Sequence, residues 1–160
     1  MRAVRKKMSL RMPANIPLTA TETCDLRAFA GTMIPASERY GAPGADDEAI
    51  FADIVKSLGR DREDIGLALK RLAILAGGAF SDLPADRRLA VANDLRAEGG
   101  VPLAALTRVI LLCYYRDDRV MLSLGLELRA PFPKGHEVEQ GDWSLLDPVR
   151  TRAPFWRPVS

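Results

Sequence analysis

Residues 61–78 read DREDIGLALKRLAILAGG, and this stretch decides the fold class. Its apolar residues recur every three or four positions, which is the spacing of one face of an α-helix. Asp61 stands in front of them as a candidate N-cap, and Gly77-Gly78 ends the pattern. We therefore predict a helix whose buried face comprises Ile65, Ala68, Leu69, Leu72 and Leu75.

Further helical patterns lie on either side of this stretch. The first begins near Thr21 or Thr23 and ends before Pro35, and the others cover residues 46–58, 84–98, 102–115 and 118–124. No convincing run of alternating strands separated by hairpin signals is present. We expect an all-α fold, a small bundle of five to six helices across residues 21–125. Its remaining core positions would be Leu26, Phe29, Ala30, Met33, Ile50, Ile54, Val55, Leu58, Leu89, Ala92, Leu95, Leu103, Leu106, Val109, Ile110 and Cys113.

The pattern changes after residue 125. Five of the eleven prolines fall in residues 126–160. Both tryptophans and two of the five phenylalanines lie there as well. Disordered tails are poor in aromatic residues, whereas aromatic residues with proline suit an extended segment in the groove of another protein. We predict three regions: a flexible basic segment (1–20), the helical domain (21–125) and a long, extended, partner-wrapping tail (126–160). The alternative is a tail that folds back on its own helices.

Residues with catalytic chemistry are few in this sequence. The glycine pairs at 77–78 and 99–100 follow helices, so they are helix stops rather than phosphate-binding turns. The cluster at residues 114–118 (YYRDD) has ionisable groups but no plausible nucleophile, so a helix cap or a docking edge explains it. His136 is the only histidine and has no neighbouring partner that would make it a general base. We predict no catalytic, cofactor-binding or metal-binding residue in this chain.

The candidate residues for a partner interface are aromatic or lie beside the prolines of the tail. Tryptophan and tyrosine dominate the binding energy of protein interfaces because they bring large apolar area. We predict an interface that includes Tyr114, Tyr115, Phe132, His136, Trp143, Phe155 and Trp156.

Charge and hydropathy restrict the environment of the protein. Residues 1–11 carry five basic groups and no acid, which indicates a solvated end or contact with an anionic surface. No basic groove with aromatic residues follows, so we expect no nucleic-acid partner.

The longest apolar run is too short to cross a bilayer, and residues 8–18 lack the apolar core of a signal peptide. Cys24 and Cys113 fall on apolar helix faces, which favours buried free thiols in a reducing compartment over a disulfide. We expect a cytoplasmic protein without direct membrane insertion.

Two groups of segments carry a family resemblance. The segments LRAFAGTMIPAS (26–37) and YGAPGA (40–45) precede an acidic helix start. Near the end stand YYRDDRV (114–120), PFPKG (131–135) and DWSLL (142–146). In patches across residues 26–146, the chain resembles the small subunit (subunit 3 type) of gluconate 2-dehydrogenase-like flavoprotein complexes.

The resemblance implies a non-catalytic companion of a large FAD-dependent dehydrogenase of the glucose-methanol-choline type. Such a subunit stabilises the large subunit and helps it to mature, and FAD belongs to the large chain. An electron-accepting cytochrome is a further implied partner. Small subunits of this kind often carry the export signal, so the alternative location is the periplasm, reached with a signal-bearing partner. Two other functions are an independent helical adaptor or chaperone and a small enzyme that uses the cluster at residues 114–118.

Overall fold

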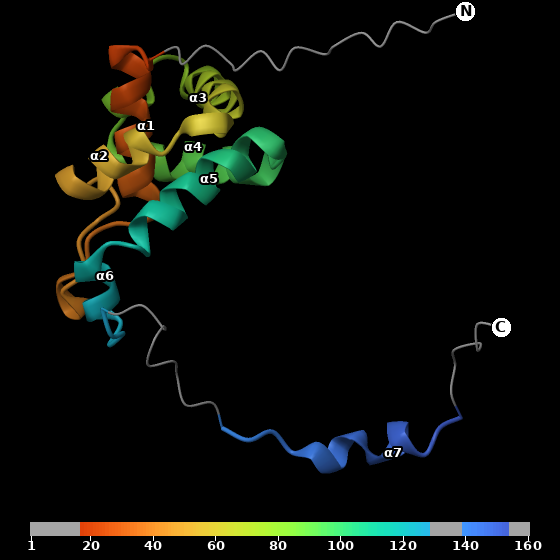
Figure 1. Ribbon diagram of the computed structural model, residues 1–160. Coiled ribbons are helices and arrows are strands. Elements are labelled where there is room, and N and C mark those ends of the chain that lie inside the picture. Colours follow the sequence, from red (N-terminus) through yellow and green to blue (C-terminus); the bar gives the residue numbers. More distant parts are fainter. Residues whose placement is uncertain (1–16, 129–138, 154–160) are drawn as a thin grey trace, which may run out of the picture. The chain divides into compact units, whose positions relative to one another are not determined.

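The computed structural model describes residues 17–128 and 139–153, and all regular secondary structure in these residues is helical. Apart from one isolated antiparallel bridge between Ser37 and Ala42, no β-pairing occurs in the described ranges. The all-α prediction is confirmed for this part of the chain. The α-helices are α1 (Ala20–Met33), α2 (Glu48–Lys56), α3 (Arg62–Ala76), α4 (Ala85–Glu98), α5 (Val101–Tyr114), α6 (Asp118–Ser123) and α7 (Asp147–Arg150) (Figure 1).

The chain divides into two units, residues 1–128 and 129–160. The first, called the helical unit here, contains α1 to α6 and has one core. Helix α3 packs against α5 and α4, α1 packs against α4, and α2 packs against α5. Figure 1 shows α5 running through this unit, with α6 following at its end. The largest fully buried side chains are Leu26, Ile50, Ile54, Ile65, Leu69, Leu72, Phe80, Leu106, Ile110, Cys113 and Val120.

Several helix ends differ from the sequence-based expectation. Helix α1 is capped by Thr19 and not by Thr21 or Thr23: Thr19 Oγ1 accepts from the Glu22 amide at 3.2 Å, and Glu22 Oε2 accepts from the Thr19 amide at 2.9 Å. This reciprocal pair is a capping box, which satisfies two free amides at once. Helix α3 has no side-chain cap, because the Asp61 carboxylate pairs with Arg108 at 2.8 Å.

The core also differs from the prediction at particular positions. Leu89 is 54% exposed, and Val91 and Leu95 form the buried face of α4 instead. Val55 is exposed, and its neighbour Phe51 is buried. The other core residues predicted within 46–58, Ile50, Ile54 and Leu58, are buried, as is Leu95 of α4, so the local pattern locates the buried face and neighbouring helices decide which residues at its edges are covered. The thiol of Cys24 is exposed while that of Cys113 is buried, and both are free.

Phe80 was missed by the sequence analysis although it is fully buried. It lies in a short 3-10 helix, η3 (Phe80–Asp82), between α3 and α4, and its ring lies 6.2 Å from that of Phe29. The adjoining amide of Ser81 donates to the carboxylate of Asp25 at 2.8 Å. Asp25 is the buried charged residue of the described core, so η3 is fixed to α1 by an aromatic contact and a polar one.

The described part of the second unit is helical over a short stretch. A 3-10 helix, η4 (Trp143–Leu146), leads directly into α7. The expectation of an extended segment is therefore wrong between residues 143 and 150. Asp142 caps the start, and Pro148 lies in the first turn of α7, where proline is well tolerated. All fifteen described residues of this unit, 139–153, are exposed.

None of the helices in the described ranges has the length and apolar character needed to cross a bilayer.

Candidate partner interface

The predicted interface residue Tyr114 lies inside the helical unit. Its side chain is 6% exposed, and its hydroxyl donates to the carbonyl oxygen of Pro43 at 3.1 Å. Burial raises the pKa of this hydroxyl, and Tyr115 and Asp117 add to the effect. Tyr114 therefore ties the end of α5 to the loop before α2. Its role in an interface stays a prediction.

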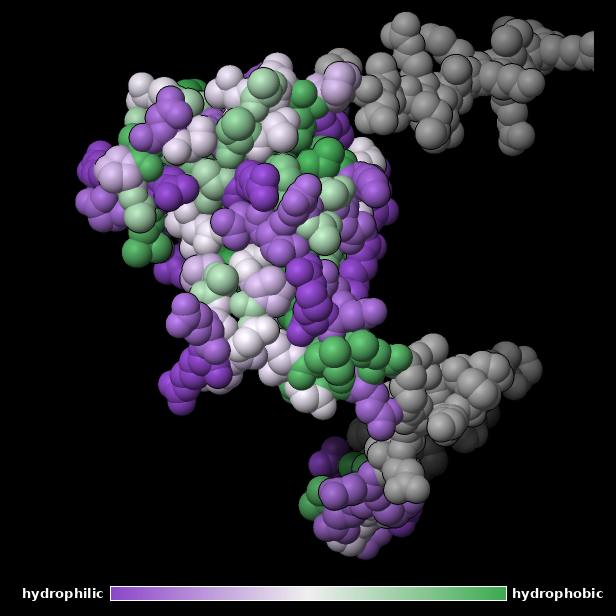
Figure 2. All heavy atoms as spheres, turned by 90° about the vertical axis from the view of Figure 1, so that its left-hand side faces the viewer, coloured by the Kyte–Doolittle hydropathy of each residue, from purple (hydrophilic) through white to green (hydrophobic). Residues whose placement is uncertain are grey.

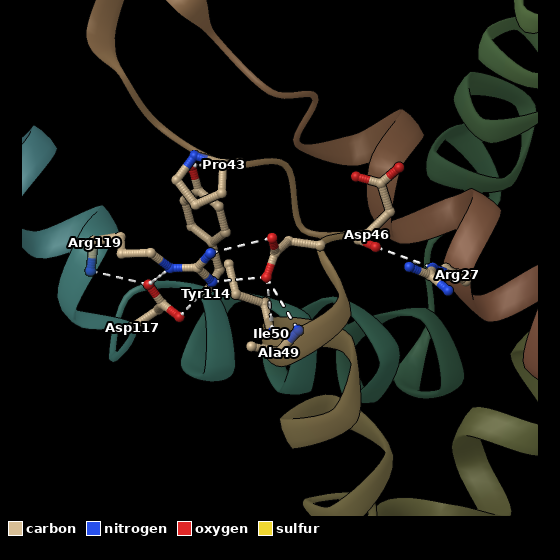
Figure 3. A network of polar contacts seen from close by, with 9 residues as sticks. Arg27, Pro43, Asp46, Ala49, Ile50, Tyr114, Asp117 and Arg119 are labelled. Carbon is tan, nitrogen blue, oxygen red and sulfur yellow. Dashed lines mark hydrogen bonds and ion pairs between the residues drawn. The ribbon is translucent and has the colours of Figure 1, made fainter.

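The loop before α2 is also fixed from its other side (Figure 3). Arg27 on α1 donates from Nε to the carbonyl oxygen of Asp46 at 3.0 Å, and its guanidinium stacks over the Phe51 ring. A Cβ atom added at Gly31 would come within 2.7 Å of the Asp46 side chain. Helix α1 and this loop can approach so closely because position 31 has no side chain.

Arg119 joins the two carboxylates that begin α2 and α6 (Figure 3). Its guanidinium binds Asp47 through both terminal nitrogens, at 2.7 and 3.2 Å. The same group binds Asp117 through Nε at 3.1 Å and Nη2 at 3.0 Å. Asp47 accepts from the amides of Ala49 and Ile50 in α2, and Asp117 accepts from the Arg119 amide in the first turn of α6, so each carboxylate is also a helix cap. We call Asp47, Asp117 and Arg119 the arginine clamp.

The hydrogen bonds of the clamp hold all three groups in their charged forms. Those from Arg119 are the main cause that lowers the pKa of Asp47 and that of Asp117. Conversely, the two carboxylates raise the pKa of Arg119. Because the clamp joins residues 72 positions apart in sequence, it fixes α6 against the start of α2.

A second arginine lies beside the clamp. Arg116 donates to Asp53 Oδ2 at 2.6 Å and to Ser57 Oγ at 2.7 Å, and its Nη2 lies 3.6 Å from the Cys113 sulfur. Burial raises the pKa of the Cys113 thiol, which keeps the sulfur protonated and weakly nucleophilic.

An open hollow of about 390 Å³ lies over these groups. Its lining comprises Ala49, Ile50, Asp53, Cys113, Arg116, Asp117, Asp118 and Arg119. The two arginines that line it, Arg116 and Arg119, already bind carboxylates of the same unit. Their ion pairs hold α2, α5 and α6 together, so no arginine of the described lining is left unpaired to attract an anion. No group of three or more histidine, cysteine or acidic side chains in the described residues is placed to hold a metal ion.

Four leucines at the end of the helical unit are exposed to solvent. Leu122, Leu124, Leu126 and Leu128 have between 44% and 59% of their surface accessible. Figure 2 shows apolar side chains gathered at this end of the unit. We call these four residues the leucine edge. The leucine edge was not predicted, although leucine alternates with other residues from 122 to 128 in the sequence.

The other predicted interface residues are distributed over both units. Tyr115 is half-exposed in the helical unit, with its ring edge-on to Tyr114 at 5.3 Å between centroids. Trp143 is 58% exposed in the second unit, where Leu145, Leu146 and Val149 are exposed as well. Four predictions lie outside the described residues: Phe132, His136, Phe155 and Trp156.

No protein-family model, curated protein or solved structure matches this chain.

Proposed function

We propose that this chain is the non-catalytic small subunit of a large FAD-dependent sugar or polyol dehydrogenase of the glucose-methanol-choline type. It stabilises the large subunit and helps it to mature, and the large subunit holds FAD and the catalytic residues. A helical bundle supplies a rigid body, and residues 126–160 form a tail that docks on the partner.

The observation that carries a partner-dependent role is the exposure of large apolar side chains in both units. The leucine edge ends the helical unit, and Trp143, Leu145, Leu146 and Val149 are exposed in the second unit. Groups of exposed large apolar side chains are typical of protein-binding sites, because leaving apolar surface in water is unfavourable. The nature of the partner is inferred from the resemblance of residues 26–146 to small subunits of flavoprotein complexes.

The rival function is an independent helical adaptor or chaperone that binds its client transiently. The leucine edge also favours this alternative, because a short exposed apolar surface can bind many clients. The two functions differ in the lifetime and identity of the complex: a subunit remains bound to one flavoprotein at a fixed ratio.

The test is co-expression of the full chain with a glucose-methanol-choline-type flavoprotein from the same genome. We expect the tagged chain to retain that flavoprotein through affinity and size-exclusion steps, with the flavin absorbance in the shared peak. Omission of this chain should reduce the yield of flavin-loaded, active dehydrogenase. A flavoprotein that matures with full activity alone and elutes apart from this chain would rule out the proposed function.

A further inference from the structure

The second unit contains a short helical segment whose shape is set by local bonds. Asp142 Oδ1 accepts from the Ser144 amide at 3.0 Å and from the Ser144 hydroxyl at 2.6 Å. At the other end, Arg150 binds Asp147 at 3.1 Å across one turn. Both ends of residues 142–150 are thus closed by side chains of the same segment.

Three apolar residues of this segment share one side. In a 3-10 helix, side chains three positions apart eclipse each other, so Trp143 and Leu146 point the same way from η4. Val149 follows three positions later in α7, and residues at this spacing are neighbours on a helix surface. We call Trp143, Leu146 and Val149 the anchor stripe. All three are exposed, with between 42% and 58% of their surface accessible.

The segment has no core of its own to hold the stripe. Helices of so few residues are unstable in water unless packing against something else stabilises them. Its side-chain hydrogen bonds join residues two or three positions apart, which orders the turn but buries nothing. An amphipathic helical segment with anchors at this spacing is the form in which many proteins occupy an apolar groove of a partner.

Acidic residues precede the anchor stripe in the sequence, and basic residues follow it. The acidic residues are Glu137, Glu139 and Asp142, and the basic residues are Arg150, Arg152 and Arg157. Asp147 lies between Leu146 and Val149 of the stripe and pairs with Arg150. Complementary potentials set the orientation of a bound segment and exclude the reverse one. A groove suited to this segment therefore has basic groups near the Asp142 end and acidic groups near the Arg152 end.

We propose that residues 142–152 form a helical docking element that inserts Trp143, Leu146 and Val149 into an apolar groove of the large flavoprotein subunit. The groove is basic at one end and acidic at the other, which fixes the direction of the segment. This inference rests on the proposed function for the identity of the partner and adds the anchor residues and the groove chemistry.

The test is a competition in cells that co-express the flavoprotein with two full-length, differently tagged copies of this chain. One copy is wild type and the other carries Trp143→Ser, Leu146→Ser and Val149→Ser. We expect the yellow complex to contain the wild-type copy in at least about 30-fold excess, since anchor residues of this kind dominate binding energy. The matched control carries Leu67→Ser, Ile74→Ser and Leu89→Ser, three comparably exposed residues of the helical unit, and should compete equally.

A second competition tests the charges. Arg150→Glu with Arg152→Glu should be under-represented about tenfold at low salt and less at high salt, because charge complementarity is screened. Lys56→Glu with Arg87→Glu, exposed on the helical unit, is the control.

The outcomes separate the two proposals. A wild-type chain that forms no complex with the flavoprotein rejects the proposed function and, with it, this inference. A wild-type complex in which the stripe variant competes equally rejects the docking element alone. Charge variants that compete as well as their control reject the dipolar groove. Circular dichroism of each variant checks that the helical unit remains folded.

Discussion

The two units of this protein differ in how far apart in sequence their contacts lie. In the helical unit, polar contacts join Asp25 to Ser81, Tyr114 to Pro43 and Arg119 to Asp47, between 56 and 72 positions apart. In residues 139–153, each side-chain hydrogen bond joins residues two or three apart. The first unit is therefore determined by tertiary packing, and the described part of the second by local caps.

This difference indicates where each unit obtains its stability. Buried apolar area is the main favourable term in folding, and the helical unit has a continuous core. The described part of the second unit buries no side chain, so burial of apolar surface contributes little to its stability. Substitutions should then affect folding in one unit and association in the other.

The largest effect on folding is expected at Phe80. The Phe80→Ala variant removes a fully buried ring that contacts Phe29, and such truncations cost about 3–5 kcal/mol. Urea unfolding of the full chain, followed by circular dichroism, measures the loss. As the matched control, Trp143→Ala should change the free energy of unfolding by less than about 0.5 kcal/mol. Equal losses in the two variants would abolish the distinction between the units.

A smaller effect is expected at Asp25. In Asp25→Ala, the Ser81 amide loses its acceptor in a buried position, which costs about 1–3 kcal/mol. Asp25→Asn keeps an acceptor oxygen and should recover part of the loss. The same urea titration gives both values. If Asp25→Ala is as stable as wild type, the contact between α1 and η3 has no energetic role.

The arginine clamp should contribute less than the core, because half of the Arg119 side chain is exposed. Ion pairs of this kind contribute up to about 1 kcal/mol. We expect Arg119→Leu to lower the free energy of unfolding by that amount in low salt and by less in high salt. Hydrogen exchange of α6 should increase more than that of α3, since the clamp fixes α6. A uniform increase over both helices would contradict this role.

The clamp also predicts a pH dependence. The folded protein lowers the pKa of Asp47 and Asp117, so their stabilising effect is complete above the ordinary carboxyl pKa of about 4. It is lost as the pH falls through their lower folded values. The slope of stability against pH below about 4 should be smaller in Arg119→Leu than in wild type. Equal slopes would mean that the helix amides alone hold these carboxylates charged.

The long periodic helices were predictable from sequence, and their ends were less so. Both α3 and α5 have apolar residues at helical spacing over four turns, so the pattern outweighs local alternatives. At α1, three threonines within five positions can each cap, and only Thr19 has Glu22 three residues later. The capping-box pattern was present in the sequence and would have identified the start.

The candidate interface was less predictable because exposure depends on tertiary contacts. Tyr114 and Tyr115 are adjacent and chemically alike, yet the Pro43 carbonyl, 71 positions away, accepts a hydrogen bond from the first alone. The leucine edge has the composition of a core segment and is exposed because no other described element covers it. The arginine clamp joins two helix caps, and nothing in the local sequence pairs Arg119 with Asp47.

The smallest effect is expected at Asp142, and it tests the local character of the second unit. Its carboxylate caps η4 through Ser144, and these hydrogen bonds lower the pKa of Asp142. In Asp142→Ala, the Ser144 amide at the start of η4 loses its cap, and its hydrogen exchange should become a few-fold faster. The same increase should appear in wild type as the pH falls below about 4, after correction for intrinsic exchange, because the protonated carboxyl is a weaker acceptor.

Asp147→Ala is the control, since Asp147 pairs with Arg150 and does not cap η4. Urea unfolding should be identical in all three proteins, because a bond between residues two positions apart supports nothing beyond its own turn. A shift of the unfolding transition in Asp142→Ala would show instead that the second unit contributes to the stability of the first.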